Sequence, residues 1–216
     1  MTGTDVVWGL GRLTIQPGVK VFAGLRVYGT DRVPVHGGAV LAVNHFSWLD
    51  PPCVGAACPR TIYYMAKIEA HRVPGLGQLI RGFGTFSVRR GESDREAVRM
   101  MRRIVTDGKA LGLFVEGTRQ RSGVPGEVKP GAAMVALQEE VAVVPAAVSG
   151  TQRWRLGNFQ PAFVAWGEPV RFDGLPRNAK GYREASHEIE RRIRVLFDFL
   201  EDVQALGRPA VAVPPR

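Results

Sequence analysis

The sequence predicts an α/β fold, in which a mostly parallel mixed sheet is flanked by helices as in a sandwich. Short apolar stretches rich in β-branched residues alternate with segments whose apolar residues recur at helical spacing. This alternation is typical of parallel strands joined by helices. The expected strands cover residues 25–28, 39–43, 61–65, 85–88, 110–115, 141–148 and 163–172.

Two of the intervening helices are clearly predicted. Over residues 94–107, Ser93 and Glu96 form a capping box, apolar residues recur at helical spacing, and arginines occupy the polar positions. We interpret this basic face as solvated surface. Over residues 180–205, apolar side chains share one side, which favours a helix that covers the sheet. The proline-rich residues 207–216 are expected to fray.

The composition favours a single domain with an anionic partner. The 216 residues are 45% hydrophobic, enough to bury a core. The formal net charge is +9 and the pI is about 10.2, which indicates nucleic acid, a lipid headgroup surface, an acidic carrier protein or a phosphorylated substrate. Cys53 and Cys58 are the only cysteines and lack the second Cys/His pair of a zinc site, so we expect reduced, packed thiols and no metal.

Residues 5–27 predict a broken amphipathic helix. Arg12, Pro17 and Lys20 interrupt the apolar run, so it is too short to span a bilayer. The helix then lies either at the headgroup level of a membrane or on the core of its own domain. No secretory signal is apparent, which places the chain on the cytoplasmic side. We divide the chain into an N-terminal segment (1–27), a main domain (28–206) and a tail (207–216).

His45 stands five positions before Asp50, between the expected strand at 39–43 and two prolines. On a regular helix the two side chains would lie roughly 140° apart and would not touch. A turn that ends in a helix N-cap at Asp50 lets the Nδ1–H of His45 meet the carboxylate while Nε2 faces a substrate. The alternative is that Asp50 only caps the helix and His45 is structural.

Two further segments carry groups suited to an anion. Arg89 and Arg90 end an expected strand at its carboxyl end, where open α/β sheets bind ligands, and the planar guanidinium suits a phosphate. Glu116 is followed by a glycine, Thr118 and Arg119, whose backbone N–H and side-chain groups suit an oxyanion or a phosphate. Glu116 can accept from a substrate hydroxyl or form a salt bridge with Arg90 or Arg119.

Two other positions have weaker interpretations. Lys129 precedes another helical pattern and is either an anion contact or a surface residue. Pro145 interrupts an apolar strand, which predicts a sheet edge or a bulge there.

Together these segments resemble the phospholipid/glycerol acyltransferase family, and within it the bacterial 1-acylglycerol-3-phosphate acyltransferases. The resemblance runs from about residue 33 to residue 151 and keeps the order and spacing of four blocks. The matching positions are Asn44, His45 and Asp50, then Gly84 and Arg90, then 114–119, then Val144 and Pro145; Lys67 and Lys129 are similar to flanking basic positions of the family. Val115 replaces the usual proline of the third block, which removes no chemical group.

The resemblance implies a glycerolphosphate-acyltransferase-like fold and transfer of a fatty acyl group from acyl-CoA or acyl carrier protein. The acceptor would be the sn-2 hydroxyl of 1-acylglycerol 3-phosphate, with phosphatidic acid as product. His45 would take the hydroxyl proton and Asp50 would hold its tautomer, without an acyl-enzyme, bound cofactor or metal. The glycerophosphate site would comprise Arg90, Glu116, Gly117, Thr118 and Arg119, with Lys67 and Lys129 as possible additions. The sequence does not identify the oxyanion donors, for which backbone N–H groups near 116–118 or 45–47 are candidates.

The resemblance also implies a peripheral or monotopic enzyme on the cytoplasmic face of the cell membrane. Three alternatives stay open. The same chemistry could serve glycerol 3-phosphate, another lysophospholipid or a glycolipid. A nucleic-acid-binding module is suggested by the net charge alone. It would need a basic stripe with exposed aromatic residues, whereas the arginines here are dispersed along the sequence. A catalytically silent lipid-binding protein would not need an intact His45 and Asp50.

Overall fold

A computed structural model describes residues 3–88, 95–155, 157–158, 160–207, 209 and 211–215, without the side chains of Asp5, Lys67 and Val88. The described residues form a seven-stranded sheet in the order β1-β7-β6-β2-β5-β3-β4. All neighbouring strands in it are parallel except β6 and β7. The strands are β1 (Arg26–Tyr28), β2 (Ala39–Val43), β3 (Ile62–Lys67), β4 (Phe86–Val88), β5 (Ala110–Phe114), β6 (Ala142–Ser149) and β7 (Phe163–Trp166).

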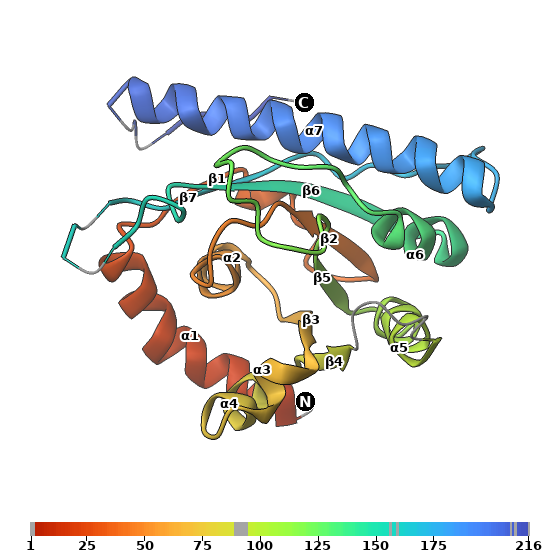
Figure 1. Cartoon of the computed structure of the whole chain (residues 1–216), viewed down its shortest axis with the longest axis horizontal. Coiled ribbons are helices and arrows are strands. Elements are labelled where there is room, and N and C mark those ends of the chain that lie inside the picture. Colours follow the sequence, from red (N-terminus) through yellow and green to blue (C-terminus); the bar gives the residue numbers. More distant parts are fainter. Residues whose placement is uncertain are drawn as a thin grey trace.

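Helices cover both faces of this sheet (Figure 1). The helices are α1 (Gly3–Phe22), α2 (Asp50–Ala57), α3 (Ile68–Arg72), α4 (Leu76–Gly82), α5 (Arg95–Thr106), α6 (Gly131–Glu139) and α7 (Ala179–Ala205), with a short 3₁₀ turn at Thr30–Arg32. The predicted α/β class is therefore confirmed, and the predicted helices at 94–107 and 180–205 correspond to α5 and α7. Ser93 lies outside the described residues.

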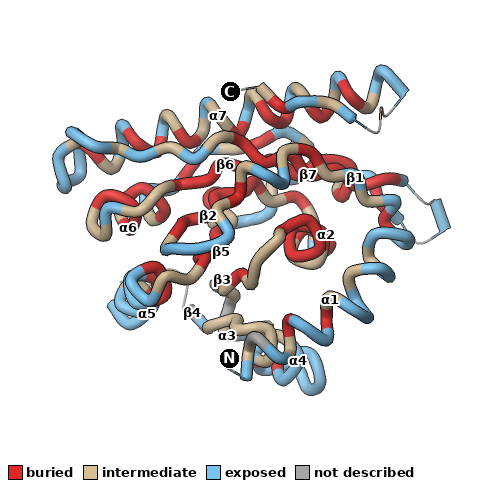
Figure 2. The backbone as a smooth tube through the Cα atoms, turned by 180° about the vertical axis from the view of Figure 1, so that it is seen from behind, coloured by how far each residue is buried: buried red, intermediate tan, exposed pale blue. Residues whose placement is uncertain are grey.

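Two apolar clusters sandwich the sheet. Leu41 and Val43 belong to a cluster with α1, α2 and the second half of α7, whereas Val40 and Ala42 belong to one with α5, α6 and the first half of α7. This division follows from the alternation of side chains along a strand. Figure 2 shows the strands buried between helices whose outer sides are exposed. Because both faces of β2 are covered, all five of its residues are buried.

Pro145 lies in β6, which is an interior strand, so the prediction of an edge strand is wrong. A bulge does lie opposite Pro145, but its extra residue belongs to the facing segment 167–169 and not to β6. Gly167 donates to the oxygen of Pro145, but the next bridge pairs Val143 with Val170, one residue out of register. Val143 and Pro145 direct their backbone groups to the same side of β6, as alternate residues of a strand do. The N–H that proline lacks would therefore have faced β7, where the pairing is irregular. The predicted strand at 163–172 accordingly ends as β7 at Trp166.

The N-terminal helix packs against the domain. α1 is one continuous helix with Pro17 inside it, so the prediction of a broken helix is wrong. Trp8 Nε1 donates to the oxygen of Phe83, Arg12 to that of Pro59 and Gln16 to that of Gly55. Its outer side leaves large apolar side chains exposed, among them Leu10, Leu13 and Val21. No helix in the described ranges is both long and apolar enough to cross a bilayer.

The described part of the tail also packs against the domain, so the expectation that it frays is wrong there. Tyr28 Oη donates to the oxygen of Pro209, and the guanidinium of Arg32 donates to the oxygens of Pro214 and Pro215. Proline carbonyls are good acceptors, and a buried guanidinium provides several donors at once.

Candidate active site

The candidate site begins where β2 ends. The Asn44 amide nitrogen donates to the oxygen of Val148, and its amide oxygen accepts from the nitrogen of Val148, at 3.0 and 2.8 Å. The side chain thereby takes the place of one more backbone pair between β2 and β6. The chain can then leave the sheet as a turn (residues 44–50, the catalytic turn below) whose start is fixed against β6.

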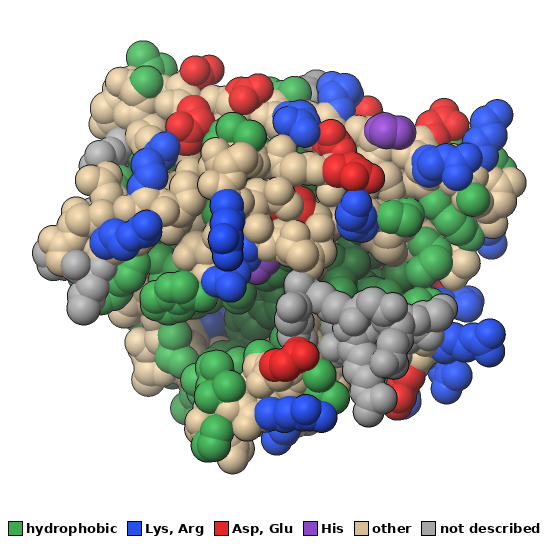
Figure 3. Space-filling view, viewed as in Figure 1, with side chains coloured by type: hydrophobic (Ala, Val, Ile, Leu, Met, Phe, Trp, Pro, Cys, Tyr) green, Lys and Arg blue, Asp and Glu red, His purple; other side chains and the backbone are tan. Residues whose placement is uncertain are grey.

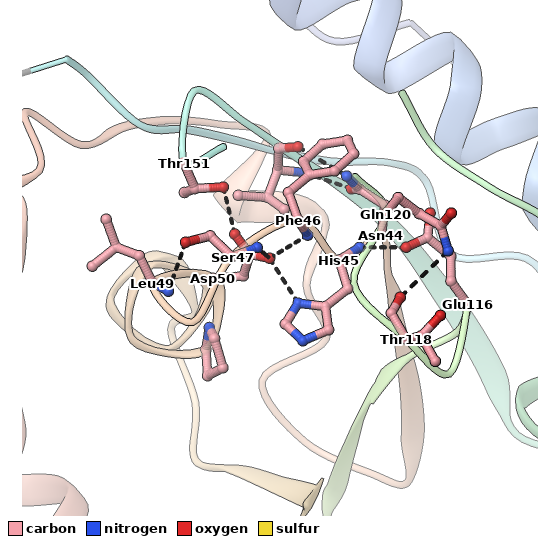
Figure 4. A network of polar contacts seen from close by, with 12 residues as sticks. Asn44, His45, Phe46, Ser47, Leu49, Asp50, Glu116, Thr118, Gln120 and Thr151 are labelled. Carbon is pink, nitrogen blue, oxygen red and sulfur yellow. Dashed lines mark hydrogen bonds and ion pairs between the residues drawn. The ribbon is translucent and has the colours of Figure 1, made fainter. Parts of the chain in front are cut away.

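His45 and Asp50 meet across this turn, as their spacing predicted. His45 Nδ1 lies 2.7 Å from Asp50 Oδ2, and the other ring nitrogen points away from the carboxylate (Figure 4). The backbone N–H groups of Phe46 and Ser47 also donate to Oδ2, at 2.6 and 2.7 Å. The predicted N-cap at Asp50 is wrong: α2 begins at Asp50 itself, Leu49 takes the cap position, and the carboxylate faces back into the turn.

The sequence reasoning missed a fourth donor to Asp50. Thr151 Oγ1 donates to Oδ1 at 2.5 Å, and both side chains are buried. Asp50 is fully buried, and such a carboxylate needs donors on both oxygens because water is excluded. The sequence separation of 101 residues hides this contact from any local pattern, although Thr151 follows the predicted strand at 141–148 by only three positions.

The imidazole of His45 stacks on Phe114, with ring centroids 4.2 Å apart, and lines a cavity of about 670 Å³. The residues that line this cavity include Tyr64, Met65 and Leu76, which are mainly apolar. Thr118, Arg119 and Arg121 also line it. Figure 3 shows this hollow with mostly hydrophobic walls and Lys or Arg side chains at its rim. An apolar chain and an anionic group can thus occupy the same cavity.

Glu116 supports the backbone of the site. Its Oε2 accepts from the N–H of His45 at 2.7 Å, its Oε1 accepts from the N–H of Gly126 at 2.6 Å, and it is 3% exposed. Burial raises the pKa of Glu116 to about 7, although both N–H donors oppose this shift. Within the described residues Glu116 forms no salt bridge with Arg119, and Arg90 lies outside them. Both carboxylate oxygens hold backbone groups, which connects the catalytic turn to residues 117–126.

The segment after Glu116 contains backbone N–H groups without a hydrogen-bond partner among the described residues. Gly117 has φ 72°, which favours glycine, and its N–H donates back to the oxygen of Phe114. The N–H groups of Thr118 and Arg119 have no hydrogen-bond partner in the described part of the chain. Gln120 N–H donates to the oxygen of His45 at 2.7 Å, which ties this segment to the catalytic turn. By contrast, the N–H groups of residues 45–47 all donate to carboxylates.

Of the remaining predicted positions, the structure describes the side chain of Lys129 alone. Lys129 pairs with Glu127 at 3.0 Å on the surface, and its side chain is not part of the cavity wall. Lys67 ends β3, but its side chain lies outside the described part, as does all of Arg90. Arg121, which was not predicted as a site residue, also lines the cavity. A second arginine two positions after Arg119 is the sequence signal that could have identified it.

Comparison with known proteins decides the family. Residues 24–149 match the family described as Acyltransferase. The chain belongs to this family. The acyltransferase is 30% identical over 188 residues to a 1-acyl-sn-glycerol-3-phosphate acyltransferase of Bacillus subtilis (strain 168), a match that covers 83% of this chain and 92% of that protein.

Two further similarities of this acyltransferase are informative. A lyso-ornithine lipid O-acyltransferase of Pseudomonas aeruginosa is 32% identical over 146 residues, which is 67% of this chain and 54% of that protein. The crystal structure of the 1-acyl-sn-glycerophosphate acyltransferase PlsC from Thermotoga maritima matches with a TM-score of 0.66 at 22% identity. This match covers 94% of this chain and 84% of that one, and it supports the fold.

Proposed function

We propose that this acyltransferase moves a fatty acyl group from an acyl thioester to the sn-2 hydroxyl of 1-acylglycerol 3-phosphate, giving phosphatidic acid. The observation that carries the proposal is the His45–Asp50 pair, with His45 in the wall of a cavity that both apolar and basic residues line. The similarity to the Bacillus subtilis enzyme supports the same acceptor. The donor is acyl-CoA or acyl carrier protein, whose thioester provides the acyl group without a bound cofactor.

In this mechanism Nε2 of His45 accepts the proton of the acceptor hydroxyl while its oxygen attacks the thioester carbonyl carbon. Asp50 keeps Nδ1 protonated and stabilises the imidazolium. Collapse of the tetrahedral intermediate breaks the carbon–sulfur bond, and the leaving thiolate takes the proton back from the imidazolium.

An acyl-enzyme is not required, because the neighbouring nucleophiles are poorly placed. Burial raises the pKa of Cys53 to about 12, with a further contribution from Asp50, so it stays a thiol. Ser47 Oγ accepts from the N–H of Leu49 and serves the turn itself.

The free N–H groups of Thr118 and Arg119 are our candidates for stabilising the oxyanion. The N–H groups of residues 45–47 are excluded because they are occupied. The guanidinium groups of Arg119 and Arg121 suit the phosphate of the acceptor. Arg90 and Lys67 stay predicted contributors, and Glu116 acts by holding the backbone that presents these donors.

We further propose that the enzyme docks peripherally on the cytoplasmic face of the membrane. The exposed apolar side of α1, with Leu13 and Val21, would enter the interface, and Leu76 and Leu79 of α4 expose further apolar surface. The net charge of +9 favours anionic headgroups.

The test is an assay of purified protein with acyl-CoA or acyl carrier protein and a panel of acceptors, followed by lipid mass and thiol release. The panel contains 1-acylglycerol 3-phosphate, glycerol 3-phosphate, other lysophospholipids and lyso-ornithine lipid. We expect preferential acylation of 1-acylglycerol 3-phosphate. The similarity to the Pseudomonas aeruginosa enzyme makes lyso-ornithine lipid the second candidate acceptor. Preference for this lipid would overturn the proposed acceptor, and turnover of none would favour a lipid-binding role.

A further inference from the structure

Thr151 lies where β6 leaves the sheet, two residues beyond the span that matches the family. Gly150 has φ 85°, and a Cβ there would come within 2.1 Å of the oxygen of Pro161, so this position requires glycine. The sharp turn at Gly150 brings the buried Thr151 hydroxyl to the catalytic turn (Figure 4).

The two oxygens of Asp50 are held by different parts of the chain. All three donors to Oδ2 come from the catalytic turn: His45 Nδ1, Phe46 N and Ser47 N. Oδ1 accepts from Thr151 alone among the described residues. Thr151, which follows β6, therefore fixes the orientation of the carboxylate plane relative to the sheet.

We propose that Thr151 is a positioning residue for acyl transfer, which fixes the carboxylate of Asp50 so that Oδ2 holds His45 in the orientation and tautomer needed for proton transfer. The proposal rests on the proposed function of His45 as the base. A carboxylate held at one oxygen only can rotate about its Cβ–Cγ bond, and Oδ2 then loses its alignment with Nδ1. Small errors in the position of a base cost large factors in rate.

Thr151 is itself rigidly supported. Arg153 N–H donates to the oxygen of Gly150, and the Trp154 ring packs edge-on against Trp48 and in a tilted contact with Phe22 of α1. The indole is nearly buried between these rings. The hydroxyl is thus presented by a packed turn, as an effective positioning group requires.

The experiment compares Thr151→Val, which keeps the shape and removes the hydroxyl, with Thr151→Ser, which keeps the hydroxyl. The matched control is Ser149→Ala. Ser149 is also fully buried at the end of β6, and its Oγ donates to a carboxylate at 2.5 Å, but that carboxylate is Glu201 of α7. Thr151→Val and Ser149→Ala each remove one buried hydroxyl that donates to a carboxylate. Of the two carboxylates, only that of Asp50 contacts His45.

For Thr151→Val we expect kcat to fall about 10- to 100-fold with a KM for the lyso acceptor within about threefold of wild type. Thr151→Ser should retain kcat within about threefold, and Ser149→Ala should leave it unchanged. The proposal is overturned by a Thr151→Val enzyme with wild-type kcat, or by a folded Thr151→Ser enzyme that loses as much activity as the valine variant.

A second readout does not depend on the acceptor. The ¹⁵N shifts of the His45 ring, assigned with His45→Ala, should report one tautomer with a proton on Nδ1 in wild type and Ser149→Ala. Thr151→Val should show a mixture of tautomers, and an unchanged ring spectrum would contradict the proposal. If wild type turns over no acceptor while the spectra behave as expected, the proposed function fails and the positioning by Thr151 stands.

Discussion

At the catalytic turn, three consecutive backbone N–H groups donate to two carboxylates, that of His45 to Glu116 and those of Phe46 and Ser47 to Asp50. The main chain and the ring of His45 are therefore both held by acids. The spacing of His45 and Asp50 was sufficient to predict their contact. The roles of Thr151 and Glu116 in holding the turn could not be predicted, because their contacts join residues 101 and 71 positions apart.

Replacing His45 by alanine should abolish acyl transfer without unfolding the protein. The ring is the proposed proton acceptor, and the contacts of its backbone N–H and oxygen do not need the side chain. Turnover and circular dichroism on one preparation check this prediction. Near-normal turnover would remove His45 from the mechanism.

Asp50→Asn should lower kcat by about 10³- to 10⁴-fold, because the amide favours the wrong tautomer of the histidine. Asp50→Ala, which also leaves buried donors unpaired, should in addition destabilise the fold. Steady-state kinetics and urea unfolding separate these two effects.

Glu116→Gln should change how stability depends on pH. The pKa of Glu116 is raised from 4.5 to about 7 by burial, so the folded protein binds this proton more tightly than the unfolded chain. The free energy of unfolding therefore decreases as pH rises from about 4.5 to about 7, by about 3 kcal/mol at most. Urea unfolding at pH 5 and pH 7 should show a smaller difference for the variant.

The matched control for that measurement is Glu127→Gln, since Glu127 belongs to the same loop and its side chain is 75% exposed. Glu127→Gln should keep the wild-type difference between the two pH values. An equal change in both variants would mean that burial of Glu116 is not the cause.

Arg119→Ala should mainly weaken use of an acceptor that carries a phosphate. The guanidinium lines the cavity and forms no salt bridge in the described ranges, so it is available to a ligand. We expect KM for 1-acylglycerol 3-phosphate to rise about 10-fold or more, with a smaller effect on an acceptor without phosphate. Unchanged KM and kcat would exclude Arg119 from the headgroup site.

At the scale of elements, the helical periodicity of α5 and α7 was sufficient to predict them, because each buries one apolar side on the sheet. α1 was harder to predict, since it has two apolar sides. One contacts α2 and α4 through Trp8 and neighbouring side chains, and the other is exposed. The interior position of Pro145 was also not predictable, because strand order depends on contacts between distant segments.

The exposed side of α1 provides a test of membrane docking. Leu13 and Val21 are 78% and 84% exposed, so Leu13→Glu with Val21→Glu should leave the fold intact and place charge where lipid is proposed. Sedimentation with vesicles of phosphatidylglycerol and phosphatidylethanolamine should show markedly weaker binding. Leu206→Glu, at a residue 79% exposed after α7, is the control and should bind as wild type. Equal binding by all proteins would contradict docking through α1.

At the scale of the whole molecule, Arg32 joins segments that are far apart in sequence. Its guanidinium donates to the backbone oxygens of Trp166, Pro214 and Pro215. It also forms an ion pair with the carboxylate of Glu168 at 3.1 Å. The alternation of strands and helices predicted the α/β class. It could not predict that the residues after α7 return to β1, because proline-rich segments carry no periodic pattern.

Arg32→Met should therefore lower the free energy of unfolding by about 2–3 kcal/mol, because it leaves several carbonyl groups without their charged donor. The kinetic constants should stay unchanged, since Arg32 is not part of the cavity wall. Arg26→Met, at an exposed arginine on β1, is the control and should change stability by less than about 0.5 kcal/mol. Equal stability of the two variants would contradict this role of Arg32.

The amide of Asn44 has a consequence for which residues this position can accept. Its nitrogen donates to the carbonyl of Val148 and its oxygen accepts from the N–H of Val148. The site therefore requires a side chain with one donor and one acceptor in a fixed orientation. Aspartate has the same outline but carries oxygen at both ends, and one of them would face the Val148 carbonyl across a 3.0 Å gap. Hydrolysis of this single amide during storage would push β2 and β6 apart at the root of the catalytic turn, without any change in the shape of the side chain.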